Sequence, residues 1–114
     1  MTNVTNTKNL QAAHFGTLGS WISLHTGAPG DTGANEVSGG SPAYARKQTV
    51  WGTPTDGLIT GSECVFDVPP GTVVTHVGVF TASTSGDFVE WADSADISFT
   101  PQGQLKVVPK YQQS

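Results

Sequence analysis

The strongest constraint on the fold is a glycine-rich segment between two strand-like runs. The segment extends from His25 to Arg46, and the flanking runs are Trp21–Thr26 and Lys47–Trp51. Glycine costs backbone entropy in regular structure and proline cannot donate a backbone hydrogen bond, so this segment cannot form a helix or a strand. Ordered loops of this length inside a small domain tend to carry function or interfaces. We therefore expect a long ordered loop between two strands.

The composition is that of an all-β domain with many turns. The chain has 114 residues, the size of one domain. Threonine and serine supply 25 residues, glycine and proline 21 (14 plus 7), and only 12% of residues are charged. Strand formers and turn formers dominate, and no stretch shows a sustained helical period. We predict one domain over residues 1–114, with all of its regular structure in β-strands.

Alternating runs separated by turn residues predict seven or eight short strands. The most regular, Thr72–Thr81, has largely apolar residues on both faces and should be a central strand. After the next turn, Phe88–Ala92 should end at a bend, Asp93–Ala95, before a further strand. This spacing is typical of sandwiches and barrels. We expect a single-domain antiparallel β-sandwich of jelly-roll-like type over residues 14–108, with an extended polar N-terminal arm (1–13) and a polar C-terminal tail (109–114).

Charge and hydropathy exclude several classes of partner. The net charge is −4 and the five basic residues form no patch, so we expect no binding to nucleic acid. No apolar run is long enough to span a membrane, and residues 1–11 lack the apolar core of a signal peptide. The single cysteine, Cys64, excludes an intrachain disulfide and a cysteine-based zinc site. We expect synthesis in a reducing cytoplasm, without membrane attachment.

No set of residues has the spacing of a catalytic or metal site. The three histidines lie far apart in the sequence, and there is no Gly-x-Ser-x-Gly motif. Glu63 and Asp67 would stand about 13 Å apart along a strand, too far for a retaining glycosidase pair. The acidic residues between positions 87 and 96 lack calcium-loop spacing and better fit a solvated strand edge that resists aggregation. We expect no enzymatic activity, no cofactor and no bound metal.

The histidines and aromatic residues favour binding or structural roles. His76 lies in an apolar strand and should be a core or interface residue, whereas His25 should fix the loop backbone through a hydrogen bond. The three tryptophans and Tyr44 could stack on sugars, as in a carbohydrate-binding module, or pack in the core or a subunit interface. The sequence alone leaves both alternatives open.

Two stretches resemble a family of small virion structural proteins of tailed bacteriophages. One begins at Trp21 and extends through Gly52, and the other is Phe66–Phe80. The most specific part is the series Leu-His-Thr, Gly-Ala-Asn-Glu-Val and Tyr-Ala-Arg between residues 24 and 46. Members are described as head-decoration, minor capsid, minor tail or tail-fibre-like proteins. The resemblance covers residues 20–92 and implies a role in virion assembly, with no catalytic residues to transfer.

Within this resemblance we expect a non-enzymatic capsid decoration or minor capsid protein that binds and stabilises the head shell. A β-domain with no coiled coil, repeat or stalk favours the head over a fibre. The expected partners are the major capsid protein and other copies of the chain in a homotrimer, the trimer by analogy alone. The alternative is a minor tail or tail-fibre-associated protein that binds tail proteins or host surface glycan. The expected interface residues, of which Asn35 and Glu36 should also pin the loop to the backbone, are Trp21, His25, Asn35, Glu36, Tyr44, Arg46 and Trp51.

Overall fold

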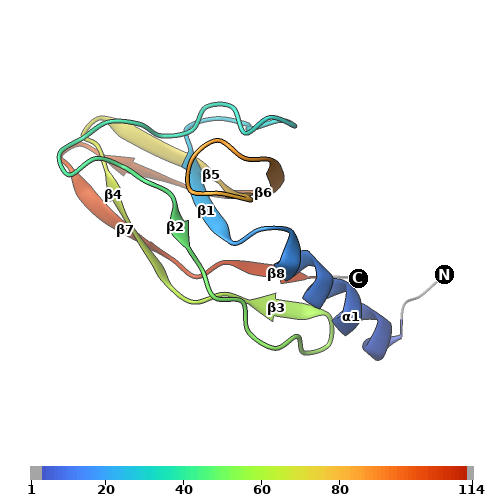
Figure 1. The fold of residues 1–114 in the computed structure, drawn as a ribbon. Helices are drawn as coiled ribbons and strands as arrows, with labels where there is room; N and C mark the ends of the chain where they lie inside the picture. The colour runs from blue at the N-terminus through green and yellow to red at the C-terminus, as the bar shows by residue number, and fades with distance from the viewer. Residues whose placement is uncertain (1–3, 113–114) are drawn as a thin grey trace.

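The structure, a computed structural model that describes residues 4–112, consists mainly of antiparallel β-strands (Figure 1). Within these residues the elements are α1 (Thr5–Leu18), β1 (Trp21–His25), β2 (Lys47–Gln48), β3 (Leu58–Thr60), β4 (Cys64–Val68), β5 (Thr72–Phe80), β6 (Phe88–Phe99), β7 (Gly103–Val107) and β8 (Lys110–Gln112). The all-β, antiparallel fold is therefore confirmed, and the glycine-rich segment is indeed a long loop between β1 and β2.

One layer is a four-stranded sheet in the order β2-β1-β5-β6. β5 lies between β1 and β6, as the apolar residues on both of its faces predict. The bend expected at Asp93–Ala95 is instead a β-bulge within one long strand. Val74 pairs with Ile97 and His76 pairs with Asp93, so residues 94–96 lie opposite Thr75 alone. β6 is thus a long, curved edge strand with no partner on its outer side among the described residues.

The second layer is a bent two-stranded ribbon. β3 pairs with β8 and β4 pairs with β7, and the Gly61 amide donates to the Pro109 carbonyl between the two pairs at 2.8 Å. Residues 47–52 join this ribbon to the sheet. β2 pairs with β1, and a few residues later Gly52 donates to Thr60 at 2.8 Å. The two layers are therefore hydrogen-bonded together along one side and separate along the other.

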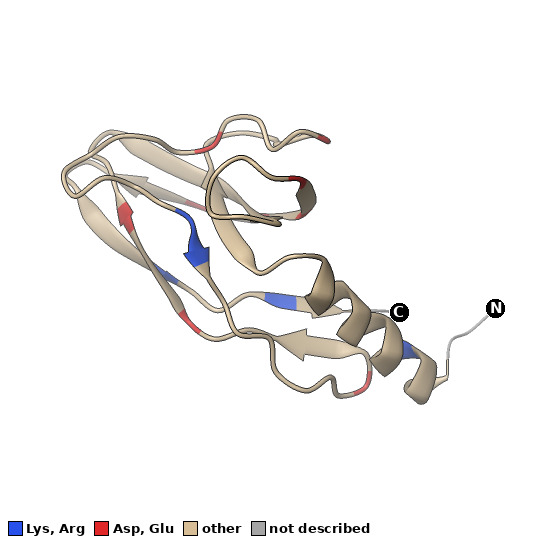
Figure 2. Ribbon diagram, viewed as in Figure 1, with Lys and Arg blue, Asp and Glu red and all other residues tan. Residues whose placement is uncertain are grey.

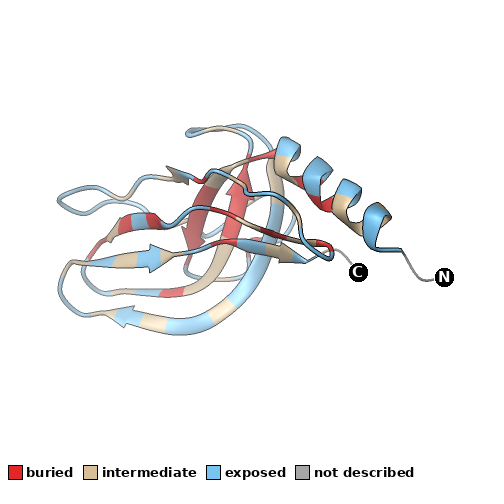
Figure 3. Ribbon diagram, turned by 90° about the horizontal axis from the view of Figure 1, so that it is seen from below, coloured by how far each residue is buried: buried red, intermediate tan, exposed pale blue. Residues whose placement is uncertain are grey.

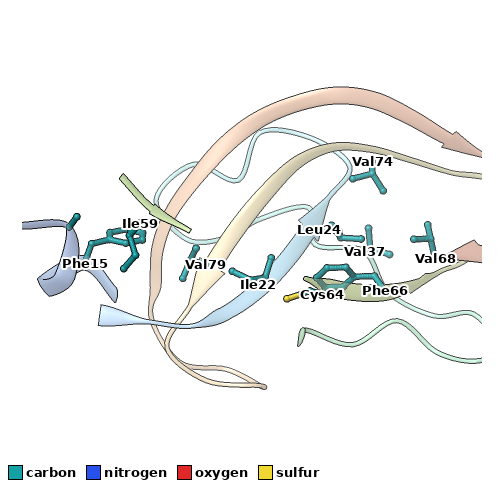
Figure 4. Close-up of a cluster of buried hydrophobic side chains, with 11 residues drawn as sticks. Phe15, Ile22, Leu24, Val37, Ile59, Cys64, Phe66, Val68, Val74 and Val79 are labelled. Atoms are coloured by element: carbon teal, nitrogen blue, oxygen red, sulfur yellow. The ribbon is translucent and has the colours of Figure 1, made fainter. Parts of the chain in front are cut away.

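The core lies between the two layers. Ile22 and Leu24 of β1 and Val74 of β5 face Phe66 and Val68 of β4, and all five side chains are fully buried (Figure 4). Alternate residues of β4 are buried, which is the pattern of a strand with one face on the core. Burial of these side chains contributes about 1.5–3 kcal/mol each and holds the layers together.

The N-terminal arm expected over residues 1–13 is wrong for the described part, because residues 5–18 form a helix. Ala12 and Phe15 are buried, and the Phe15 ring stacks on Tyr111 with centroids 3.8 Å apart. Leu10 and Leu18 remain exposed, so the apolar residues do not follow one helical face. The sequence therefore carries little helical periodicity, and contacts with the β-layers stabilise the helix instead.

The C-terminal tail is also more regular than expected, because Lys110–Gln112 form β8 against β3. Residues 1–3 of the expected arm and 113–114 of the expected tail lie outside the described residues. α1 extends the molecule at one end, giving overall dimensions of 46 × 23 × 22 Å (Figures 1 and 3). None of the described helical residues forms a segment long and apolar enough to cross a membrane.

Candidate interaction surfaces

An ion pair between Glu36 and Arg46 closes the base of the glycine-rich loop. Arg46 Nε and Nη2 donate to the two carboxylate oxygens of Glu36, each at 2.9 Å. The Arg46 side chain is only 10% exposed and that of Glu36 21%. This two-pronged geometry suits guanidinium and carboxylate, and it fixes the ends of the loop in one arrangement.

Arg46 also ties the loop to the β5–β6 hairpin. Its Nη1 donates to the carbonyl oxygens of Ala82 at 3.0 Å and Ser85 at 2.8 Å. The guanidinium carbon lies 3.4 Å from the centre of the Phe80 ring, in cation–π contact. One side chain thus connects two loops that are distant in the sequence.

Tyr44 completes this cluster from the inner side. Its hydroxyl donates to Glu36 Oε2 at 2.8 Å and accepts from the Leu24 amide at 3.0 Å. Burial raises the pKa of Tyr44 well above its ordinary range, so the phenol remains a donor. Burial alone would raise the pKa of Glu36, but hydrogen bonds from Arg46 and Tyr44 outweigh it and hold that pKa below its ordinary value.

His25 fixes the other side of the loop, as expected. Its Nδ1 lies 2.9 Å from the Ala34 carbonyl, which can only accept, so Nδ1 carries the proton. In the neutral ring Nε2 then accepts from the Ser23 hydroxyl at 2.7 Å. Burial lowers the pKa of His25, against the opposing effects of the Ala34 carbonyl and Glu36. Neutral His25 is therefore a structural link between β1 and the loop.

Glycine at position 78 makes room for this arrangement. An ideal Cβ there would lie 2.6 Å from Phe88 Cε1, 2.8 Å from Ser23 Oγ and 2.9 Å from His25 Nε2. Only a residue without a side chain lets these groups meet over the centre of the sheet.

Asn35 pins the loop as predicted, and Glu36 does so by another route. The Asn35 side-chain amide donates to the Ala28 carbonyl at 3.2 Å, and the residue has φ +61°, a conformation that asparagine tolerates. Glu36 bonds to side chains rather than to the backbone contacts expected from the sequence. The structure brings His25, Asn35, Glu36, Tyr44 and Arg46 together around one loop.

The tryptophans separate into two kinds. Trp51 Nε1 donates to the Gly19 carbonyl at 2.9 Å, and its ring meets the edge of Phe15. Trp21 is partly buried at the start of β1. In the sequence it precedes the glycine-rich loop, whereas Trp51 follows that loop. Trp91 is 40% exposed and lies on edge strand β6. An interface role for Trp21 and Trp51 stays a prediction, and Trp91 is the better candidate for contact with a ligand.

His76 and the acidic residues lie on or beside the outer edge of the sheet. His76 is partly buried, with Nε2 2.8 Å from Asp93 Oδ1, and its ring meets the edge of Trp91. Glu90, Asp93 and Asp96 are exposed on β6, as expected of an edge that resists aggregation. Among the described residues no three histidine, cysteine or acidic side chains gather as they would around a metal ion.

Trp91 of β6 lines two depressions in the described part of the structure. A further hollow, of about 340 Å³, lies between the loop and the β5–β6 hairpin and does not include Trp91. The first, which we call the Trp91 hollow, measures about 310 Å³ and is lined by Gly30, Asp31, Phe88, Val89, Glu90 and Trp91. The second, which we call the seam groove, measures about 200 Å³ and lies between β6 and the segment Val107–Tyr111.

The seam groove lies on the side where no strand pairing joins the two layers within residues 4–112. Its floor includes Ile22, Val77 and Val79 of the sheet, and its rims are β6 and the β7–β8 segment. Trp91 on one rim and Val108 on the other are 40% and 47% exposed. The sequence analysis missed this groove. The available signal was a difference in charge, because 88–99 contains acids and no bases while 103–112 contains bases and no acids.

Comparison with models of known protein families identifies the family of this chain. Residues 4–105 match the family described as podophage GP4 fiber I protein gp80. The chain belongs to that family. The match includes α1, strands β1 to β6 and the first part of β7, so it extends beyond the residues 20–92 that carried the sequence resemblance. A search of curated proteins found no match.

Membership of the fibre I family confirms the resemblance to small virion proteins of tailed phages. The protein is a bacteriophage structural protein and a component of the virion. The family description names a fibre, so it fits the tail alternative better than the capsid decoration favoured from the sequence.

Proposed function

We propose that this protein is a non-enzymatic subunit of a phage tail fibre. Its two β-layers make structural contacts within the fibre and carry out no catalysis. The observation that carries the proposal is the fibre-family match over residues 4–105. The shape agrees with it, because the molecule is about twice as long as it is wide, at 46 × 23 × 22 Å.

The internal contacts of the loop support a structural role. The polar groups of Glu36, Tyr44 and Arg46 form hydrogen bonds with one another and with the backbone of neighbouring segments. A loop held in one conformation loses little entropy when it meets a partner, which favours permanent assembly. The same contacts leave these side chains few groups for acid–base chemistry.

Location on the particle tests the proposal. Purified virions would be labelled with gold-conjugated antibody against the chain, and its copy number measured by mass spectrometry against the major capsid protein. Label on the tail, with few copies per particle, is the expected result. Label over the whole head, with hundreds of copies, would establish the capsid decoration role instead.

Host glycan is the second candidate partner, and the Trp91 hollow is the observation that favours it. A half-exposed indole can stack on a sugar ring, while Asp31 and Glu90 beside it can accept hydrogen bonds from sugar hydroxyls. The full chain would be applied to an array of bacterial surface glycans. Binding that Trp91→Ala abolishes and Val50→Ala retains is expected, because Val50 is exposed but does not line the hollow. Equal binding by both variants would exclude the Trp91 hollow as the glycan site.

A further inference from the structure

Two edge strands, β6 and β7, border the seam groove and carry charges of opposite sign. β6 pairs only with β5, and β7 pairs only with β4, so in each strand the backbone groups on the outer side have no ladder partner among residues 4–112. Glu90, Asp93 and Asp96 lie on β6, and we call this rim the acidic edge. The other rim, the basic edge, carries Lys106 in β7 and Lys110 in β8. Figure 2 shows basic residues in blue on both of these strands.

Most charges of these edges have no ion-pair partner within residues 4–112. The ion pairs there are Glu36–Arg46 and His76–Asp93, and neither joins the two edges. Within the same residues Glu90 and Asp96 form no ion pair with a basic residue, and Lys106 and Lys110 form none with an acidic one. The acids and the β-bulge of β6 oppose pairing with an arbitrary strand, and a strand that carries lysines removes the first of these obstacles.

We propose that copies of this chain join head to tail, the acidic edge of β6 in one copy pairing with β7 of the basic edge in the next. Pairing of like edges is disfavoured, because it would set acid against acid or lysine against lysine across the strands. Pairing of unlike edges brings opposite charges together and completes both rows of backbone hydrogen bonds. It also covers Trp91 and Val108, which are the exposed apolar side chains on the two rims.

In the head-to-tail arrangement each copy offers its acidic edge to one neighbour and its basic edge to another, so the contact is heterologous. Such contacts generate a ring if the rotation between copies closes, or a filament if it does not. The basic surface that the acidic edge requires is present on the chain itself, which is why a second copy, rather than another protein, is the occupant. The proposal holds whether the protein lies on the tail or on the head.

The first measurement is the oligomeric state of the full chain by sedimentation velocity over a range of protein and salt concentrations. We expect species larger than the monomer that dissociate as salt rises from about 0.05 M to about 1 M, because salt screens exposed charges. A chain that remains monomeric at every concentration would overturn the proposal, and the seam would then be free or covered by a different protein.

Matched single variants test the edges. Lys106→Glu should weaken self-association by more than about tenfold, because like charges across an interface are strongly unfavourable. Lys8→Glu makes the same change of charge on α1, away from both edges, and should weaken it less than about twofold. Circular dichroism would establish that both variants fold. Equal effects of the two would show that only net charge matters and would refute the edge contact.

Exchange of the charges gives a sharper test. Lys106→Glu with Lys110→Glu, or Glu90→Lys with Asp96→Lys, should each abolish association, and all four changes in one chain should restore it. Failure of the four-fold variant to associate while it remains folded would contradict the proposal.

Cross-linking identifies the contact directly. A carbodiimide joins carboxylates to amines that touch, and a mixture of ¹⁴N- and ¹⁵N-labelled chains distinguishes links between copies from links within one. Mixed-isotope products that join the β6 peptide to Lys106 or Lys110 are expected. Products linked only within one chain would refute the proposal.

Discussion

The contacts of Arg46 predict that lysine cannot replace it. The guanidinium makes four hydrogen bonds, two to Glu36 and one each to Ala82 and Ser85, and lies over the Phe80 ring. An ammonium group has the same charge but a single nitrogen, so it can keep only part of this set. At least two bonds to the loop and hairpin should be lost in Arg46→Lys.

The size of the effect follows from the burial of the pair. Hydrogen bonds to charged groups contribute about 1.5–3 kcal/mol each, and partial exposure of Glu36 lets water replace some of this, so Arg46→Lys should cost about 2 kcal/mol. Arg46→Met leaves the Glu36 carboxylate with no cation and should cost about 3 kcal/mol. For a domain of this size, a loss of 2 kcal/mol lowers Tm by about 10 °C.

Urea unfolding at neutral pH, followed by circular dichroism, measures these losses. A double-mutant cycle with Glu36→Gln and Arg46→Met isolates the ion pair, and we expect a coupling free energy of about 1.5 kcal/mol or more. Coupling below about 0.5 kcal/mol, with Arg46→Lys as stable as the wild type, would refute the reasoning. The loop would then be held by its backbone contacts alone.

Four further predictions concern single positions in the β-layers and the helix. Because burial lowers the pKa of His25, the unfolded chain binds a proton below about pH 6.5 that the folded chain does not, so the free energy of unfolding should fall from pH 7 to pH 5. That fall in the free energy of unfolding should be smaller in His25→Asn. An equal pH dependence in the variant and the wild type would contradict the assignment of the effect to His25. Gly78→Ala should cost about 2 kcal/mol in urea unfolding, because its methyl group would overlap Phe88 and the His25 ring, and a loss under 0.5 kcal/mol would show that the site is not tightly packed. Phe15→Ala should cost about 3 kcal/mol and reduce the helical signal at 222 nm, whereas a retained signal would mean that α1 does not depend on this ring. The Cys64 thiol is buried and its pKa is raised, so it should react with a thiol reagent only after unfolding, and fast reaction of the native chain would contradict its position.

The strands were predictable because their residues alternate and their ends carry turn residues. The sequence of β5 alone indicated a central strand, and the loop followed from its glycines. α1 was not predictable in the same way, because Ala12 and Phe15 are buried while Leu10 and Leu18 are exposed. Its position depends on the ring of Tyr111, almost a hundred residues away in the chain. Such a contact leaves no periodic signal in the helix itself.

The loop residues were predictable as a group but not in their detailed roles. His25 and Asn35 make the kind of backbone contact that their residue types favour locally. The pairing of Glu36 with Arg46 depends on how the loop folds over β5, and the two backbone carbonyls that Arg46 reaches belong to a different hairpin. Side-chain pairs of this kind require the tertiary fold and cannot be read from spacing.

Part of the surface charge is divided between the two edges of the seam groove. The chain has five basic residues, and Arg46 is held inside the loop by Glu36, which removes one charge of each sign from the surface. Of the four lysines that remain, two lie on the β7–β8 rim, and the β6 rim has three acids. A chain with so few charges gains little from scattering them for solubility. The separation of these three acids and two lysines onto opposite edges of the groove is what a directional contact between identical subunits requires, because each edge attracts the other and repels its own kind.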